Sequence, residues 1–144
     1  MRTYGLGHTR CTAKIGATAN AEWTLMTTRK SHKQRGATFE TALRDWFREM
    51  GMKAERLART GKEDEGDVYI ENFKNCPIII EAKAPGASNR IDLSGWLKEA
   101  EVEAANYAKH RNLKHKVPGL VVIKARGKSI DDAYVVIRLK DYPW

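Results

Sequence analysis

Two β-rich runs separated by a short turn constrain the fold of this chain more than any other part of its sequence. The first run spans 67–72 (DVYIEN), the second spans 77–84 (PIIIEAKA), and the four residues between them are typical of a turn. This order predicts an antiparallel hairpin. If the hairpin pairs symmetrically about Lys74, Asp67 lies directly opposite Glu81, and directly opposed residues share one face of a sheet.

Strand alternation adds a third charged side chain to that face. Alternate residues of a strand point to opposite sides, so Glu81 and Lys83 lie on one side and Ile80 and Ala82 on the other. Two carboxylates, counting Asp67, and one ammonium group would then converge. The prediction depends on the register, because a slip of one residue would move every side chain to the opposite face.

A helix and a short strand are predicted before the hairpin. Apolar residues recur at helical spacing from Phe39 to Met50, and Gly51 follows where helices commonly end, which predicts a helix over 34–50. The segment 52–60 is expected to contain a short strand.

A second helix is predicted over 94–111, with Ser94 as its N-cap, acids early and bases late. Its expected inner face is made by Leu97, Ala100, Ala104, Tyr107 and Ala108. Strands are expected at 120–125 and 133–139. The order αβββαββ predicts a single α/β domain with a mixed sheet.

The segment 1–25 shows neither helical nor strand periodicity, and small and polar residues dominate it. We therefore expect a poorly ordered N-terminal extension over 1–25 and the folded domain over 26–144. Translation starting at Met26 is one hypothesis for the extension. An ordered arm that clasps a partner or nucleic acid is the alternative.

The charge balance favours a polyanionic partner. The chain has 26 Lys and Arg against 18 Asp and Glu, which gives a formal net charge of +8 and a sequence pI near 9.6. The basic residues are spread along the chain, as expected for a protein that binds nucleic acid, although a merely soluble basic protein would show the same balance.

The cysteines and the hydropathy exclude several classes. Cys11 and Cys76 form no CxxC pair and lie near no histidine at metal-ligand spacing, so neither a disulfide framework nor a zinc site is supported. No apolar run approaches the roughly 18 residues of a membrane-spanning helix, and the amino terminus has no secretory-type apolar region. We expect no membrane association and a cytoplasmic location, in the host cytoplasm for a viral source.

Two carboxylates beside a lysine suit phosphodiester hydrolysis. Mg²⁺ prefers hard oxygen ligands, can activate a water and can neutralise charge on phosphorus, while a lysine can orient or deprotonate that water or stabilise departing charge. The alternative is that Asp67 caps a turn while Glu81 and Lys83 form an ordinary exposed pair. Against it, the apolar run 77–80 ends in an acid, which is costly to bury without a purpose, and Pro85 places the charged end at the rim of the sheet.

Gly66-Asp67 followed by Ile-Ile-Glu81-Ala82-Lys83 resembles the D…ExK signature of the PD-(D/E)XK nuclease superfamily, with Gly66 in place of the usual proline. Within it, the chain is most similar to the small archaeal-type Holliday junction resolvases. The matching features are Arg35-Gly36…Phe39-Glu40, Arg59-Thr60-Gly61, the ExK strand and the strand LVVIKA. The resemblance covers about residues 30–142 and implies a restriction-endonuclease-like domain whose mixed central sheet is flanked by helices.

The resemblance also implies roles for individual residues. Asp67 and Glu81 would bind Mg²⁺, or Mn²⁺ in its place, with the Ala82 carbonyl as a third ligand, and Lys83 would serve the nucleophilic water. Glu40 matches the acid that completes the metal site in these resolvases; a solvated helix glutamate is its alternative. Where many members carry a glutamine on the following helix, this chain has Glu99, Glu103 and Asn106, which we place on the outer face.

Basic side chains would contact DNA phosphates if the start of the first helix faces the DNA. They are Lys30, Lys33 and Arg35, with Lys124, Arg126 and Lys128 as a second candidate patch. The resemblance also implies that Thr60 stands where the family often has a hydroxyl residue near the phosphate. A solvated surface is the alternative for each. Trp96 either packs in the core or stacks in a dimer interface.

The resemblance implies an endonuclease of DNA recombination and repair that cuts branched DNA such as four-way junctions, as a homodimer whose two sites nick two strands. One alternative keeps the site in a restriction-type, exonucleolytic or recombination nuclease. Another is a non-catalytic nucleic-acid-binding protein. Finding Asp67, Glu81 and Lys83 together argues against the last.

Overall fold

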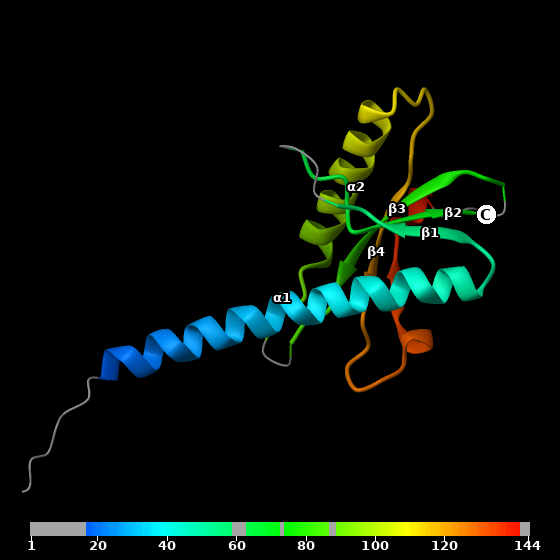
Figure 1. The fold of residues 1–144 in the computed structure, drawn as a ribbon. Coiled ribbons are helices and arrows are strands. Elements are labelled where there is room, and N and C mark those ends of the chain that lie inside the picture. Colours follow the sequence, from blue (N-terminus) through cyan, green and yellow to red (C-terminus); the bar gives the residue numbers. More distant parts are fainter. Residues whose placement is uncertain (1–16, 59–62, 73, 87–88, 142–144) are drawn as a thin grey trace, which may run out of the picture. The chain divides into compact units, whose positions relative to one another are not determined.

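The computed structural model of the chain describes residues 17–58, 63–72, 74–86 and 89–141, with side chains from residue 31 onward (Figure 1). The chain divides into two compact units between Ser31 and His32, and the whole sheet belongs to the second. The predicted boundary between an extension at 1–25 and a domain at 26–144 stays a prediction, because residues 1–16 lie outside the described part.

Five strands form one mixed sheet in the order β1-β2-β3-β4-β5. The pair β3 and β4 is parallel and the other neighbours are antiparallel, which confirms the predicted mixed α/β class. The strands are β1 (Lys53–Arg56), β2 (Val68–Glu71), β3 (Pro77–Lys83), β4 (Gly119–Ile123) and β5 (Tyr134–Val136). The last strand is shorter than the predicted 133–139, because short 3₁₀ turns at Ile130–Asp132 and Leu139–Asp141 flank it.

The register of the hairpin β2–β3 is the predicted one. Val68 pairs with Ile80 and Ile70 with Ile78, so the pairing is symmetric about Lys74. The turn is fixed by the Asn72 carboxamide, whose Oδ1 accepts hydrogen bonds from the backbone N–H groups of Lys74 (2.9 Å) and Cys76 (3.0 Å).

The first helix, α1 (Ala17–Glu49), begins earlier than the predicted 34–50. No proline or glycine lies between Ala17 and Arg35, so local sequence gives the helix no reason to stop there. Within the second unit, Phe39 and Leu43 of α1 are buried in a cluster with residues of the sheet. The apolar stripe therefore covers one face, formed by Val68, Ile70, Ile80, Ala82 and Val122.

The second helix, α2 (Leu93–His110), covers the opposite face. Its N-cap is Asp92 and not Ser94, because Asp92 Oδ1 accepts a hydrogen bond from Gly95 N (3.0 Å). The helix approaches β4 so closely that a Cβ atom at Gly119 would lie 2.1 Å from Ala100 O. Glycine is therefore required at the start of β4.

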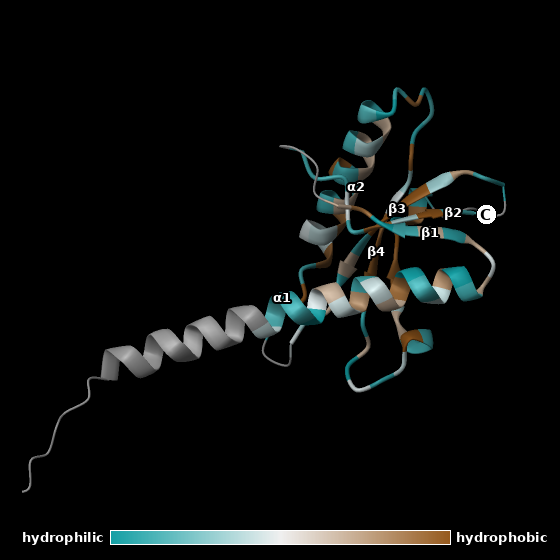
Figure 2. Cartoon of the chain, viewed as in Figure 1, coloured by the Kyte–Doolittle hydropathy of each residue, from teal (hydrophilic) through white to brown (hydrophobic). Residues whose placement is uncertain are grey.

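Hydrophobic residues are concentrated in the strands between the two helices (Figure 2). Tyr69 and Ile79 pack with Ala104, Tyr107 and Val117 on the α2 side. In the part of the chain that the structure describes, no helix has the length and apolarity to cross a membrane.

Candidate active site

Asp67 lies one residue before β2 and is fixed to β3 through two hydrogen bonds. Its backbone N–H donates to Ile80 O (3.1 Å), and its carboxylate Oδ2 accepts from Ala82 N (2.9 Å). The regular pairing of the hairpin ends at Val68 and Ile80, so the position of Asp67 opposite Glu81 stays a prediction, although the two carboxylates are close enough for the Glu81 charge to act on Asp67. The N–H and C=O of one strand residue point to the same side, so the Ala82 carbonyl also faces Asp67.

Gly66, the residue before Asp67, has a backbone conformation that the sequence did not indicate. It is buried, its φ is +96°, and a Cβ atom there would lie 2.5 Å from Ile79 Cγ2. Proline, which the sequence resemblance would place here, has φ near −65° and cannot adopt this conformation. Glycine thus sets the path by which the chain enters Asp67.

Glu81 and Lys83 lie on the α2 side of β3 and form an ion pair. Lys83 Nζ donates to Glu81 Oε1 (2.5 Å) and to Glu99 Oε2 on α2 (2.8 Å), and lies 5.9 Å from the centre of the Trp96 ring. The Glu81 side chain is nearly fully buried, whereas about half of the Glu99 side chain is exposed. The ammonium group is therefore shared between a strand and a helix.

Glu103, predicted on the outer face of α2, is instead buried against the sheet, and this prediction was wrong. Only 5% of the residue is exposed. It lies on the same helical stripe as Ala100, Ala104 and Tyr107, which pack on the sheet. Its neighbour one turn earlier, Glu99, reaches Lys83, so both acids face the site.

Burial changes the proton affinity of two acids in this cluster. It is the main reason that the pKa of Asp67 rises to about 7, and the charges of Glu81 and Glu40 add to it. Burial likewise raises the pKa of Glu103 to about 9, and a hydrogen bond with Glu81 and the negative charge of Glu81 raise it further. Such shifts are typical of sites where carboxylates are held close together for a function.

Glu40 of α1 pairs with Arg56 of β1. The Arg56 guanidinium donates through Nη2 and Nε to Glu40 Oε2, the second at 3.1 Å, and through Nη1 to Thr41 Oγ1 at 3.3 Å. The half-buried Glu40 is close enough for its charge to raise the pKa of Asp67. It therefore lies beside the cluster, with a basic partner that sequence reasoning missed.

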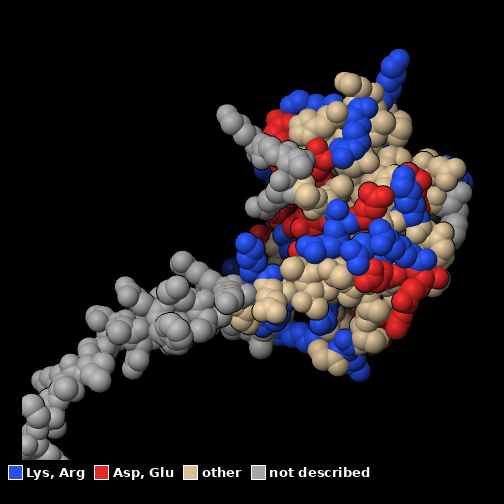
Figure 3. All heavy atoms as spheres, in the orientation of Figure 1, with Lys and Arg blue, Asp and Glu red and all other residues tan. Residues whose placement is uncertain are grey.

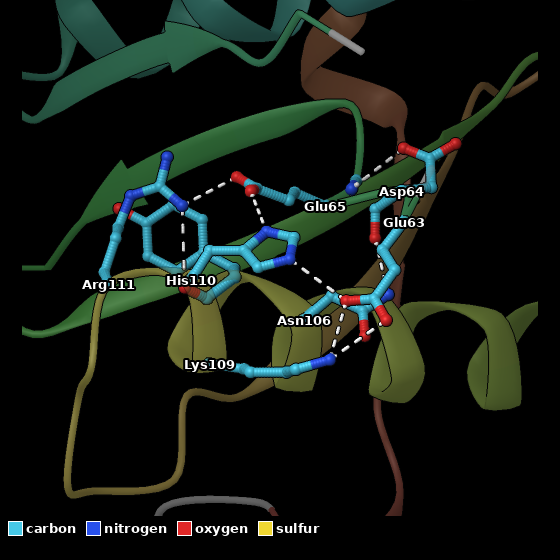
Figure 4. Close-up of polar contacts among 9 residues, drawn as sticks. Glu63, Asp64, Glu65, Asn106, Lys109, His110 and Arg111 are labelled. Atoms are coloured by element: carbon cyan, nitrogen blue, oxygen red, sulfur yellow. Dashed lines mark hydrogen bonds and ion pairs between the residues drawn. The ribbon is translucent and has the colours of Figure 1, made fainter. Parts of the chain in front are cut away.

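The loop before Asp67 is held by the last turns of α2 (Figure 4). Asn106 Nδ2 donates to Asp64 O (2.8 Å), and the His110 ring bridges Glu63 (3.0 Å) and Glu65 (2.5 Å). Further hydrogen bonds run from Lys109 Nζ to Glu63 (3.0 Å) and from Arg111 Nη1 to Glu65 (2.6 Å). These hydrogen bonds fix the loop that leads into Asp67, and nothing in the local sequence indicated them.

One residue from each predicted basic patch lies at the loop after β3. Arg126 Nη2 donates to Gly86 O (2.7 Å), and a Cβ atom at Gly86 would lie 3.2 Å from Arg35 Nη2. Lys33 and Lys124 are exposed. Thr60 and the Lys30 side chain lie outside the described residues.

On the face shown in Figure 3, Lys and Arg side chains gather over the sheet beside α1, with Asp and Glu side chains next to them. Some of the basic side chains of α1 and β1 are paired with acids, as Arg56 is with Glu40 and Lys53 with Glu71.

The donor set fits a hard divalent cation. Asp67 holds the Ala82 N–H through Oδ2, which leaves Oδ1 as its second carboxylate oxygen; Glu81 supplies a buried carboxylate, and the Ala82 carbonyl faces Asp67. Oxygen ligands from one or two carboxylates and a carbonyl are what Mg²⁺ and Mn²⁺ take in proteins. The charges of Glu81 and Glu40 both act on Asp67, so these three acids are close, and their role as metal ligands stays a prediction.

No protein-family model and no curated protein matches the chain. Among solved structures, it is similar to Hjc of Archaeoglobus fulgidus, a Holliday junction resolvase from an archaeal hyperthermophile. The two share 16% sequence identity over 70% of this chain and 75% of the other, with a TM-score of 0.49. A similarity at this level does not indicate activity.

Proposed function

We propose that this chain is a divalent-metal-dependent deoxyribonuclease of the PD-(D/E)XK type that cuts branched DNA, such as Holliday junctions, as a homodimer in recombination and repair. One observation carries the proposal. The Asp67 carboxylate accepts a hydrogen bond from Ala82 N (2.9 Å) and lies within reach of the charge of the buried Glu81, which accepts a hydrogen bond from Lys83 (2.5 Å). The preference for branched DNA rests on the sequence resemblance alone.

In the proposed reaction, Asp67, Glu81 and the Ala82 carbonyl would hold Mg²⁺ or Mn²⁺, and Glu40 would complete the site. When bound, the ion supplies Lewis acidity to the scissile phosphate and lowers the pKa of a water. Burial lowers the pKa of Lys83, but the hydrogen bonds and charges of Glu81 and Glu99 outweigh it, so the net pKa is raised. Lys83 therefore stays an ammonium group and acts as a donor, which orients the attacking water or stabilises developing charge.

The basic residues position the DNA. Arg35 and Arg126 meet at Gly86, three residues after Lys83, so phosphates bound there lie next to the cluster. We assign Lys33 and Lys124 to the same phosphate-binding surface, with Lys30 and Thr60 as further contacts. Such contacts fix the register of the DNA without reading its sequence.

Cleavage of a panel of labelled DNAs tests the proposal. Four-way, three-way, flap, duplex and single-stranded substrates are incubated in Mg²⁺, Mn²⁺, Ca²⁺ or EDTA. We expect cutting of branched substrates in Mg²⁺ and Mn²⁺ only. Undiminished cutting in EDTA would exclude the metal mechanism, and preferential cutting of duplex or ends would favour the restriction-type or exonucleolytic alternative.

Asp67→Asn should abolish cutting and preserve DNA binding, because it removes one carboxylate charge from the cation site and leaves the basic surface unchanged. Glu49→Gln removes one carboxylate from the exposed end of α1 and is the matched control. Band-shift and cleavage assays on the same four-way junction measure both effects. Normal cutting by Asp67→Asn would show that the ligand is assigned wrongly.

A further inference from the structure

A second group of carboxylates lies on the α2 side of the proposed cation site. Glu81 comes from β3, and Glu99 and Glu103 lie one turn apart on α2. One carboxylate oxygen of each lies within 4.8 Å of the others. Glu81 and Glu103 are buried, while Glu99 is exposed and opens the group to solvent.

One carboxylate oxygen of Glu103 is unsatisfied. Within the described part of the chain, Glu103 Oε2 is a buried side-chain atom with no hydrogen-bond partner, and the residue is only 5% exposed. The Lys83 ammonium donates to Glu81 and Glu99 and leaves this oxygen unsatisfied. Buried carboxylate oxygens normally have a donor or a cation, so this atom independently indicates that a ligand belongs there.

The three-acid group is bordered by backbone on one side and by an open hollow on the other. A Cβ atom at Gly66 would lie 3.6 Å from Glu103 Oε2, so the backbone before Asp67 closes one side. On the other side, Glu99 and Glu103 line an open hollow of about 810 Å³ together with Trp96. A hydrated ion can therefore enter from solvent.

We propose that Glu81, Glu99 and Glu103 bind a second divalent cation, with Glu81 shared between it and the first. The proposal deepens the proposed nuclease function and rests on it for the shared ligand. Two oxygens on opposite sides of Mg²⁺ lie about 4.2 Å apart. The three carboxylate oxygens now lie within 4.8 Å of one another, so small side-chain movements bring them to ligand distance from one ion. Paired cations that share a carboxylate clamp both the attacking and the leaving oxygen of a phosphodiester.

Titration of the full chain with Mn²⁺, in the absence of DNA, tests the second site. Calorimetry gives the number of ions bound, and electron paramagnetic resonance detects the magnetic coupling between two close Mn²⁺ ions. The variants are Glu103→Gln, Glu99→Gln and Asp67→Asn, with Glu49→Gln as the control. Because Glu99 is exposed, its variant keeps the test valid if Glu103→Gln fails to fold, as judged by circular dichroism.

We expect the wild-type chain and Glu49→Gln to bind two coupled Mn²⁺ ions. Glu103→Gln and Glu99→Gln should each weaken one ion at least tenfold and abolish the coupling, while Asp67→Asn should weaken the other. One bound ion that depends on Asp67 and is unaffected by Glu99→Gln and Glu103→Gln would overturn the second site and leave the nuclease proposal intact. Two coupled ions in a chain that cuts no DNA would support the second site and contradict the proposed function.

Discussion

Replacing Glu103 by glutamine should stabilise the metal-free protein, and the gain should grow with pH. The folded protein holds a proton on Glu103, whose pKa is raised to about 9, whereas the unfolded chain releases that proton near pH 4.5. The unfolded state therefore binds fewer protons between these values, so the free energy of unfolding of the wild type falls as pH rises through this window. Glutamine has almost the same shape and no proton to lose.

The size of the gain follows from the width of the window. Each pKa unit corresponds to about 1.4 kcal/mol, so the cost to the wild type at pH 7 is at most about 3 kcal/mol. Local relaxation and entering water reduce it, and we expect a gain of about 1 to 3 kcal/mol at pH 7. The amide of glutamine also donates to Glu81, which replaces the hydrogen bond that protonated Glu103 makes.

Urea unfolding of both proteins in EDTA, at steps between pH 4.5 and pH 8.5, measures the effect. The difference in unfolding free energy should be near zero at the acid end and rise steadily. Glu49→Gln, at an exposed position of α1, should show no such rise. A difference that is constant with pH, or a wild type that is more stable at pH 8.5, would refute the assignment of a buried, protonated Glu103.

Two further changes test the geometry around the site. Gly66→Ala should lower the free energy of unfolding by about 2 to 4 kcal/mol, measured by urea unfolding, because φ is positive and the new Cβ atom would overlap Ile79; an unchanged stability would contradict the observed turn. Arg126→Ala should weaken junction binding and lower the slope of log K against log salt by about one, whereas Lys114→Ala should leave both unchanged. An unaltered salt slope would remove Arg126 from the phosphate contacts.

The hairpin at the centre of the site could be predicted because several signals agree there. The apolar run before Glu81, the turn residues and the strand alternation all specify one register, and the observed pairing of Val68 with Ile80 has that register. The two helices were predicted from the helical spacing of their apolar residues. For α2, the sequence offers two residues of the N-cap type, Asp92 and Ser94, and composition does not decide between them.

Glu103 was missed for a physical reason. A charge on a helix is normally solvated, so the glutamate was placed on the outer face although its position, three residues after Ala100 and four before Tyr107, lies on the buried stripe. Position in the helical repeat was the better signal. The partner of Glu40, Arg56, was not detectable from local pattern, because only the pairing of β1 with β2 brings the strand near α1.

The helix α2 contributes both to the acidic group and to the hydrogen bonds that hold the loop before Asp67. It supplies Glu99 and Glu103 to the acidic group, and through Asn106 and His110 it holds the loop that leads into Asp67. The pKa of Asp67 and of Glu103 is raised because these carboxyl groups are buried near other acids. A divalent cation bound there would offset that repulsion, so Mn²⁺ should raise the melting temperature of the wild type, and Asp67→Asn should reduce the increase.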